Sequence, residues 1–274
     1  MRQLSTIIMI MVAATVSAQS YEELFEQATQ ELKQERYAQA ESLYLRAIAR
    51  EPSHRLNEYA YSNLAFAQWT QGKAPEAIAS YTKALALSPQ STQIMLQRAR
   101  IYVEQGIIDS ALVDYSNVLT TEPRNSHALF MRAYIYGQKE EYTKAYADYN
   151  ALLAIEPSNN DARLSLALLY HKAGRLNDAL MLLGVLIDGN PQNAEYYYAR
   201  SNVHRKENLA ALALMDIEKA IELAPRNAAY HIAHAQLLLD TGDRRAARKA
   251  LDQAVASGEQ PSTLVELYKQ CSEN

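Results

Sequence analysis

Three histidines in the last third of the chain have the type and spacing that could bind a metal ion. His231 and His234 are three residues apart, so they share one face of a helix, and His204 precedes them. Three imidazoles could hold zinc, which prefers nitrogen and sulfur ligands in tetrahedral geometry. No cysteine or evident carboxylate completes the set, and histidine often fills packing positions. The sequence therefore favours a structural role, and we expect no metal site.

The stretch EYYYARSNVHRKENL, Glu195 to Leu209, is the second place where side chains gather that could bind a ligand. Its tyrosines offer large apolar surfaces with a polar tip, and its basic residues offer positive charge, a combination that binding surfaces use. Motifs of catalysis are not found: there is no glycine-rich phosphate loop, no Gly-x-Ser-x-Gly, no paired cysteines and no His-Glu-x-x-His. We expect a non-enzymatic protein without a cofactor.

The elements that must position these side chains follow from a repeat along the chain. Six of the eight prolines are spaced by 37 residues and then four times by 34. They are Pro52, Pro89, Pro123, Pro157, Pro191 and Pro225, and in register with them run Ala40, Ala77, Ala111, Ala145, Ala179, Ala213 and Ala247. A second row of small residues, from Ala28 to Ala235, lets two helices approach closely. Each unit therefore predicts one helical hairpin, which proline ends.

This pattern resembles the tetratricopeptide repeat family and is met most fully by YSNLAFAQWTQGKAPEAIASYTKALALSP and FMRAYIYGQKEEYTKAYADYNALLAIEP. The repeat region, 19–260, divides into seven units, the last of which runs one residue further: 21–54, 58–91, 92–125, 126–159, 160–193, 194–227 and 228–261. The resemblance implies an all-α fold, an α-solenoid whose helix-turn-helix units wind into a right-handed superhelix. It also implies a concave groove lined by the first helix of each unit.

The two ends of the chain carry different predictions. Residues 1–18 have one basic residue, Arg2, then an apolar run and small residues before Gln19, which is typical of a secretory signal peptide. The signal peptide predicts export to the periplasm or outside the cell. The apolar run is too short to span a bilayer, so we expect no membrane insertion after cleavage. Residues 262–274 form a C-terminal capping helix, expected from Ser262 to Ser272, in which Cys271 is a buried small hydrophobe.

Three units carry an arginine at position 7, counted from the first residue of the unit, where leucine is usual. The same three units alone carry an aspartate at position 23, which gives Arg98 with Asp114, Arg132 with Asp148, and Arg200 with Asp216. Because the charges come and go together within one chain, we predict three ion pairs between the two helices of a hairpin. They repeat with the scaffold, so a structural role is favoured over a catalytic one.

Positions 2, 5, 9, 12 and 13 are not required by the hairpin and, by the resemblance, point into the groove. The candidate partner-binding residues at these positions are Tyr59, Phe66, Trp69, Phe130, Tyr134, His171, Lys172, Tyr198, Arg205 and Lys206. Exposed aromatics on a rigid concave surface suit peptide binding, although packing against neighbouring helices is an equally good interpretation of each one. Half of the stretch from Glu195 to Leu209 is thus groove and half is scaffold.

The groove residues predict a protein or peptide partner with an acidic segment, held by the aromatics and by the basic patch of His171, Lys172, Arg205 and Lys206. A net charge of −4 disfavours nucleic acid. The alternative is a glycan or cell-wall fragment stacked on Trp69 and the tyrosines. Self-association through an exposed repeat face remains open.

Overall fold

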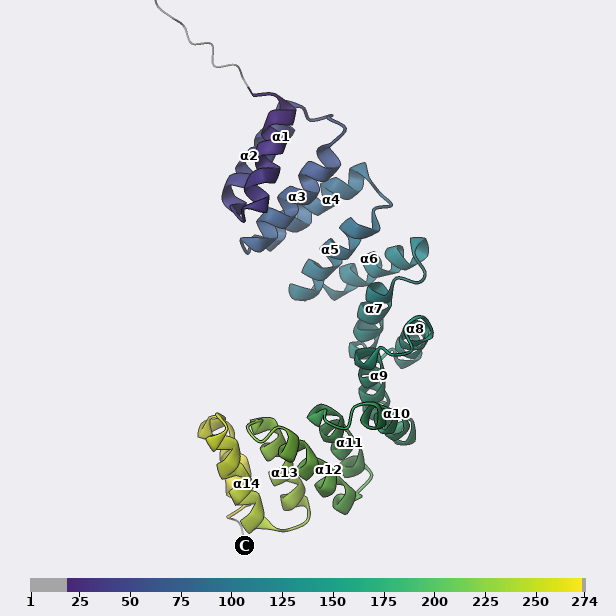
Figure 1. Ribbon diagram of the computed structural model, residues 1–274, viewed down its shortest axis with the longest axis vertical. Coiled ribbons are helices and arrows are strands. Elements are labelled where there is room, and N and C mark those ends of the chain that lie inside the picture. The colour runs from purple at the N-terminus through teal and green to yellow at the C-terminus, as the bar shows by residue number, and fades with distance from the viewer. Residues whose placement is uncertain (1–18, 273–274) are drawn as a thin grey trace, which may run out of the picture. The chain divides into compact units, whose positions relative to one another are not determined.

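The computed structural model describes residues 19–272, so the predicted signal peptide and the last two residues lie outside the described residues. All the regular secondary structure in this range is helical (Figure 1). The helices are α1 (Tyr21–Lys33), α2 (Tyr37–Arg50), α3 (Asn57–Thr70), α4 (Ala74–Leu87), α5 (Thr92–Glu104), α6 (Ile108–Thr121), α7 (Ser126–Gln138), α8 (Tyr142–Ile155), α9 (Asn160–Lys172), α10 (Leu176–Gly189), α11 (Ala194–Lys206), α12 (Ala210–Leu223), α13 (Ala228–Asp240), α14 (Arg244–Ala256) and α15 (Val265–Gln270), with a 3-10 turn η1 (Pro261–Thr263) before the last.

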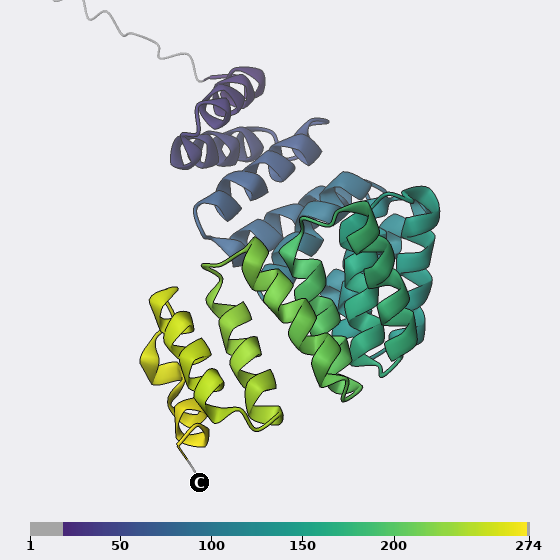
Figure 2. The same cartoon turned by 60° about the horizontal axis from the view of Figure 1, so that its bottom comes forward.

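Consecutive helices pair as hairpins from α1–α2 to α13–α14, which confirms the predicted all-α fold of tandem helix-turn-helix units. We call the odd-numbered helices α1 to α13 the A helices and the even-numbered helices α2 to α14 the B helices. Helices α1–α6 form one compact unit, up to Thr121, and α7–α15 form a second, from Glu122. Figure 2 lets the hairpins of the second unit, teal to yellow, be followed one after another.

The seam inside each hairpin is built from the small residues of the repeat. Ala28 on α1 and Ala40 on α2 are both fully buried, and Tyr44 fills the space beside them. The Tyr44 hydroxyl lies 3.0 Å from Thr29 Oγ1 and accepts a hydrogen bond from Asn63 Nδ2 at 3.0 Å, so its polar tip is satisfied between α1 and α3. Tyr44 therefore joins the first hairpin to the second.

The turn between the two helices needs a residue with positive φ at position 15. Gly72, Gly106, Gly174 and Gly242 supply it with φ of 70° to 85°. The other three units place Glu35, Glu140 and Asn208 there, with φ of 58° to 60°, although side chains make this conformation costly. The hairpin geometry thus imposes the turn even where the sequence lacks the glycine.

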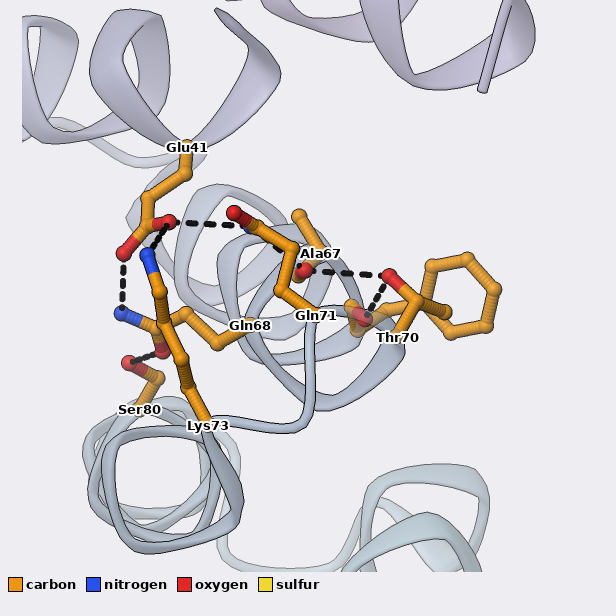
Figure 3. A network of polar contacts seen from close by, with 8 residues as sticks. Glu41, Ala67, Gln68, Thr70, Gln71, Lys73 and Ser80 are labelled. Carbon is orange, nitrogen blue, oxygen red and sulfur yellow. Dashed lines mark hydrogen bonds and ion pairs between the residues drawn. The ribbon is translucent and has the colours of Figure 1, made fainter. Parts of the chain in front are cut away.

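A polar network ties the first hairpin to the second around Glu41 on α2 (Figure 3). Its carboxylate accepts hydrogen bonds from Lys73 Nζ at 2.7 Å, from Gln71 Nε2 at 2.9 Å and from Gln68 Nε2 at 3.3 Å. Gln68 is buried and in turn accepts from the buried Ser80 hydroxyl at 2.7 Å. Burial favours a raised pKa of Glu41, but the donors outweigh it and hold the pKa below its usual value.

We expect Glu41→Gln to lower the free energy of unfolding by about 1 kcal/mol at pH 7, because a neutral amide loses the charge-assisted bond to Lys73. The folded-state pKa is depressed, so this stability is present above the unfolded-state pKa and is lost as the pH falls through the folded value. In chemical denaturation at a series of pH values from neutral to acid, the free energies of unfolding of the wild type and of Glu41→Gln should become equal. Glu76→Gln, at an exposed acid of α4, is the control. A difference in the free energy of unfolding that stays constant down to acid pH would contradict a stabilising role of the Glu41 charge.

The C-terminal segment differs from the predicted helix of Ser262 to Ser272. Regular helix begins only at Val265, because Leu264, at φ −104° and ψ 2°, leaves the helical conformation and buries its side chain against the last hairpin. Leu267, Tyr268 and Cys271 pack beside it. The Tyr268 hydroxyl also donates a hydrogen bond to Asp252 Oδ1 at 2.9 Å. The segment therefore covers α14 through a turn and a short helix.

Candidate functional site

The three candidate residues of the first compact unit, α1–α6, form an aromatic row on α3. Tyr59 is 55% exposed and Phe66 is 36% exposed, and the spacing of Tyr59, Phe66 and Trp69 places them on one face of the helix. The Phe66 ring lies 6.0 Å from the Trp69 ring and meets Tyr37 of α2 edge-on at 6.3 Å. The row thus offers rings held by their neighbours but still open to a ligand.

Trp69 is more firmly engaged than the other two members of the row. Its Nε1–H donates to Glu104 Oε2 at 2.8 Å, and the Arg100 guanidinium lies 4.5 Å from the ring centroid. Arg100 Nε also donates to Glu104 Oε1 at 3.1 Å. Trp69 therefore links α3 to α5, and one face of its indole is already covered by a cation.

In the second compact unit, α7–α15, the candidate residues Phe130 and Tyr134 differ in their exposure to solvent. Phe130 is half-buried and packs edge-on against Tyr149 at 5.7 Å, so it belongs to the hairpin. Tyr134 is 47% exposed and, with the exposed Leu168, borders a hollow of about 190 Å³ between α7 and α9. The helices approach closely there, since a Cβ added to Gly137 would lie 2.8 Å from Leu169 Cδ1. Tyr134 is thus the accessible member of the two.

The predicted basic patch is brought together on α9 and α11, but its cations bind within the chain. Lys206 Nζ donates to the His171 carbonyl at 2.9 Å, and Lys172 Nζ donates to the Gly137 carbonyl at 3.3 Å. Both carbonyls lie in the last turn of the preceding A helix, where a cation also meets the negative end of the helix dipole. Burial and the nearby Lys206 charge lower the pKa of the His171 imidazole. The two lysines therefore help to join successive A helices.

The remaining candidates are also engaged. Arg205 Nε donates to Asp240 Oδ2 on α13 at 2.6 Å, and Arg205 and Lys206 line a cleft of about 760 Å³ with His171, Asn202 and Asp240. The Tyr198 ring centroid lies 5.0 Å from that of Tyr230 on α13, and the partly buried Tyr198 side chain packs against the core. The cleft is lined by both positive and negative side chains, so it is not a purely cationic surface.

These contacts share a register that sequence reasoning missed. Trp69 with Glu104, and Arg205 with Asp240, both join position 12 of one A helix to position 13 of the next A helix, 35 residues later. The lysine contacts join the same two positions in the opposite direction. The separation of 35 residues between complementary side chains was the available signal.

All three arginine–aspartate pairs are formed, each through two parallel hydrogen bonds. The bonds measure 2.9 and 2.8 Å for Arg98–Asp114, 2.7 and 2.7 Å for Arg132–Asp148, and 2.8 and 2.7 Å for Arg200–Asp216. The aspartates are buried, and the hydrogen bonds to them raise the pKa of each arginine. The pairs brace A against B helices and are not open to a ligand.

The three histidines are not assembled as a ligand set. His231 Nε2 lies 2.8 Å from the Pro225 carbonyl oxygen, and His204 Nε2 lies 3.6 Å from Asp216 Oδ2. Residues 19–272 contain no group of three or more histidine, cysteine, aspartate or glutamate side chains placed to hold a metal ion. Over the same stretch, every helix is too short or too polar to cross a bilayer.

The family of this chain follows from models of the tetratricopeptide repeat. One such model matches residues 25–92, 96–160 and 232–264, a second matches 136–203 and a third matches 194–227. The chain therefore belongs to the tetratricopeptide repeat family. No curated protein matches the sequence.

Solved structures agree with this assignment. A tetratricopeptide repeat protein from Parabacteroides merdae is 28% identical, with a TM-score of 0.70 over 93% of this chain and all of the other. The C-terminal part of a repeat protein from Cytophaga hutchinsonii is 16% identical, with a TM-score of 0.70 over 89% of this chain and 98% of the other. YrrB, described as a repeat protein with an unusual peptide-binding site, is 19% identical, with a TM-score of 0.56 over 66% and 92%.

Proposed function

We propose that this protein is a non-catalytic scaffold that binds a peptide or protein partner on its A helices. The observation that carries the proposal is the exposed aromatic row of α3, where Tyr59 and Phe66 keep about half and a third of their surface open. Rings of this kind bury a large area at little cost in side-chain entropy, so they often dominate binding energy. YrrB, which shares the fold, is described by its peptide-binding site, and this supports the same use of the helices here.

The proposed partner carries an acidic segment, but the structure changes how much that segment can contribute. Arg205 is already paired with Asp240, and Lys206 with the His171 carbonyl. A carboxylate of the partner must therefore compete with Asp240 in the cleft between α11 and α13. Most of the affinity should come from the aromatic contacts, and charge should mainly set the orientation of the peptide.

The proposed place of action is the cell envelope, after export. Its support is the sequence of residues 1–18, whose basic start, short apolar run and small residues fit a signal peptide. Glycan binding is the second candidate function, because the exposed rings of Tyr59 and Phe66 could also stack on sugars. The Trp69 ring, the best stacking platform, is covered on one face by Arg100, and this favours the peptide.

A comparison of two variants in a pull-down from envelope extract tests the proposal. Tyr59→Ala/Phe66→Ala removes the open rings of α3, and Leu45→Ala/Val113→Ala removes other exposed apolar side chains, from α2 and α6. We expect at least a tenfold loss of the bound partner for the first variant and none for the second. Circular dichroism checks that both are folded. Equal retention by both variants would refute binding at α3, and retention of cell-wall fragments in place of a protein would favour the glycan.

A further inference from the structure

A mostly apolar hollow of about 440 Å³ opens between the last two hairpins, among α12, α13 and α14. Ile221 of α12, Leu238 of α13 and Ala250 of α14 contribute its apolar lining. None of the candidate partner-binding residues described above borders it, although His231 and His234 do. The hollow is therefore a separate site from the proposed partner-binding surface.

The hollow lies where the last unit lacks the long side chains that three other units place at the same positions. Position 7 and position 23 hold an arginine–aspartate pair in three units, and position 11 adds a tyrosine beside Arg98 and Arg132. In the last unit these positions are His234, Ala250 and Leu238. A shorter ring and a methyl group replace a guanidinium and a carboxylate, which leaves room for a guest.

The polar group inside the hollow has spare hydrogen-bonding capacity. The half-buried His234 imidazole makes no hydrogen bond within residues 19–272, whereas its neighbour His231 is held by the Pro225 carbonyl. Burial lowers the pKa of His234, the Glu218 carboxylate partly offsets this, and His231 lowers the pKa further, which favours the neutral ring. A neutral imidazole can donate one hydrogen bond and accept one.

The two walls of the hollow have opposite charge. Glu218 lies on the α12 wall and Lys249 on the α14 wall, and within residues 19–272 no ion pair joins these two side chains. No other acid or base lines the hollow besides the two histidines. Arg245, one turn before Lys249, is also exposed and extends the positive wall. The arrangement offers an anion-binding edge and a cation-binding edge on either side of an apolar floor.

We propose that this hollow binds an α-amino acid with an apolar side chain as a free zwitterion. Its carboxylate lies toward Lys249, its ammonium group lies toward Glu218, and its side chain occupies the floor beside His234. Opposite charges on opposed walls select a molecule that carries both, and an apolar floor selects its side chain. The proposal is independent of partner binding at α3.

Titration of the protein with L-phenylalanine and L-leucine, followed by NMR of the histidine ring protons, tests the site. We expect saturable shifts of the His234 and His231 signals at millimolar concentration or below. The probes 3-phenylpropionate and 2-phenylethylamine each lack one charge and should bind about tenfold more weakly. Glu218→Gln should weaken L-phenylalanine but not 3-phenylpropionate, and Lys249→Gln should weaken L-phenylalanine but not 2-phenylethylamine.

The repeat itself supplies the control variant. His234→Arg/Ala250→Asp restores the pair found in three other units, so it should fold and fill the hollow, and we expect it to abolish binding. Ala250→Leu fills the hollow without new charges and carries the same expectation if the first variant does not fold. No histidine shifts at about 10 mM L-phenylalanine, or unchanged binding by a folded filled variant, would overturn the proposal.

Discussion

Asp114→Ala should lower the free energy of unfolding by about 3 kcal/mol, because it leaves the Arg98 guanidinium without its partner in a packed seam. The Arg98 side chain is 17% exposed and that of Asp114 is 2% exposed, so little water can replace the carboxylate. One hydrogen bond, to Thr82 Oγ1 at 2.9 Å, would remain for the arginine. Guanidinium denaturation followed by circular dichroism measures the change.

The matched control removes both charges together. Arg98→Leu/Asp114→Leu should cost less than the single aspartate replacement, because it leaves no buried charge unpaired. The chain itself shows that two leucines fit, since Leu166 and Leu182 occupy these positions in the fifth unit, where Leu166 is buried. If the single and double variants unfold at the same denaturant concentration, the pairing does not contribute as described.

Leu183→Ala is the second large effect, with an expected loss of about 3 kcal/mol in the free energy of unfolding. Leu183 lies on α10, is fully buried, and packs with Leu186 of the same helix and Tyr196 and Val203 of α11. Truncation leaves a cavity at the contact that joins the fifth hairpin to the sixth. Thermal and chemical unfolding monitored by circular dichroism give the loss.

Met181→Ala on the same helix provides the comparison. Met181 is 61% exposed, so its removal should change the free energy of unfolding by less than about 0.5 kcal/mol. The two substitutions are half a turn apart and share the same backbone. Equal losses for both would mean that α10 does not contribute its buried face as the structure places it.

The fold could be predicted from the sequence because the repeat states the same hairpin seven times. A residue type that recurs at the same position in seven units is not a chance match, so Ala40, Ala77 and their counterparts identified the contact between the two helices of each hairpin. The three arginine–aspartate pairs could be predicted for the same reason, since arginine occurs at position 7 only in the units that have aspartate at position 23. Both features are properties of single hairpins, which local sequence can specify.

The candidate site was less predictable because it depends on contacts between hairpins. Trp69 is tied to Glu104, and Arg205 to Asp240, through side chains one repeat away that no single-unit pattern connects. Lys172 and Lys206 bind backbone carbonyls, which leave no trace in side-chain identity. Tyr59, Phe66 and Tyr134 nevertheless keep 55%, 36% and 47% of their surface exposed.

The hollow between the last two hairpins is a third case, in which a departure from the repeat suggests a binding site. His234 and Ala250 look unremarkable alone, since histidine and alanine are common in helices. Their meaning appears only when the same positions are compared with Arg200 and Asp216, which fill the preceding unit. A position that loses its structural pair becomes available for a ligand.

Photo-crosslinking from single positions tests the central claim, partner binding on the A helices, most directly. A photoreactive phenylalanine analogue is placed at Tyr59 or Phe66 on α3, or at the exposed Leu45 and Val113 on B helices as controls. We expect one protein to be captured in cells from positions 59 and 66 and not from 45 and 113. Capture from the B-helix positions alone, or from none of the four, would contradict the account.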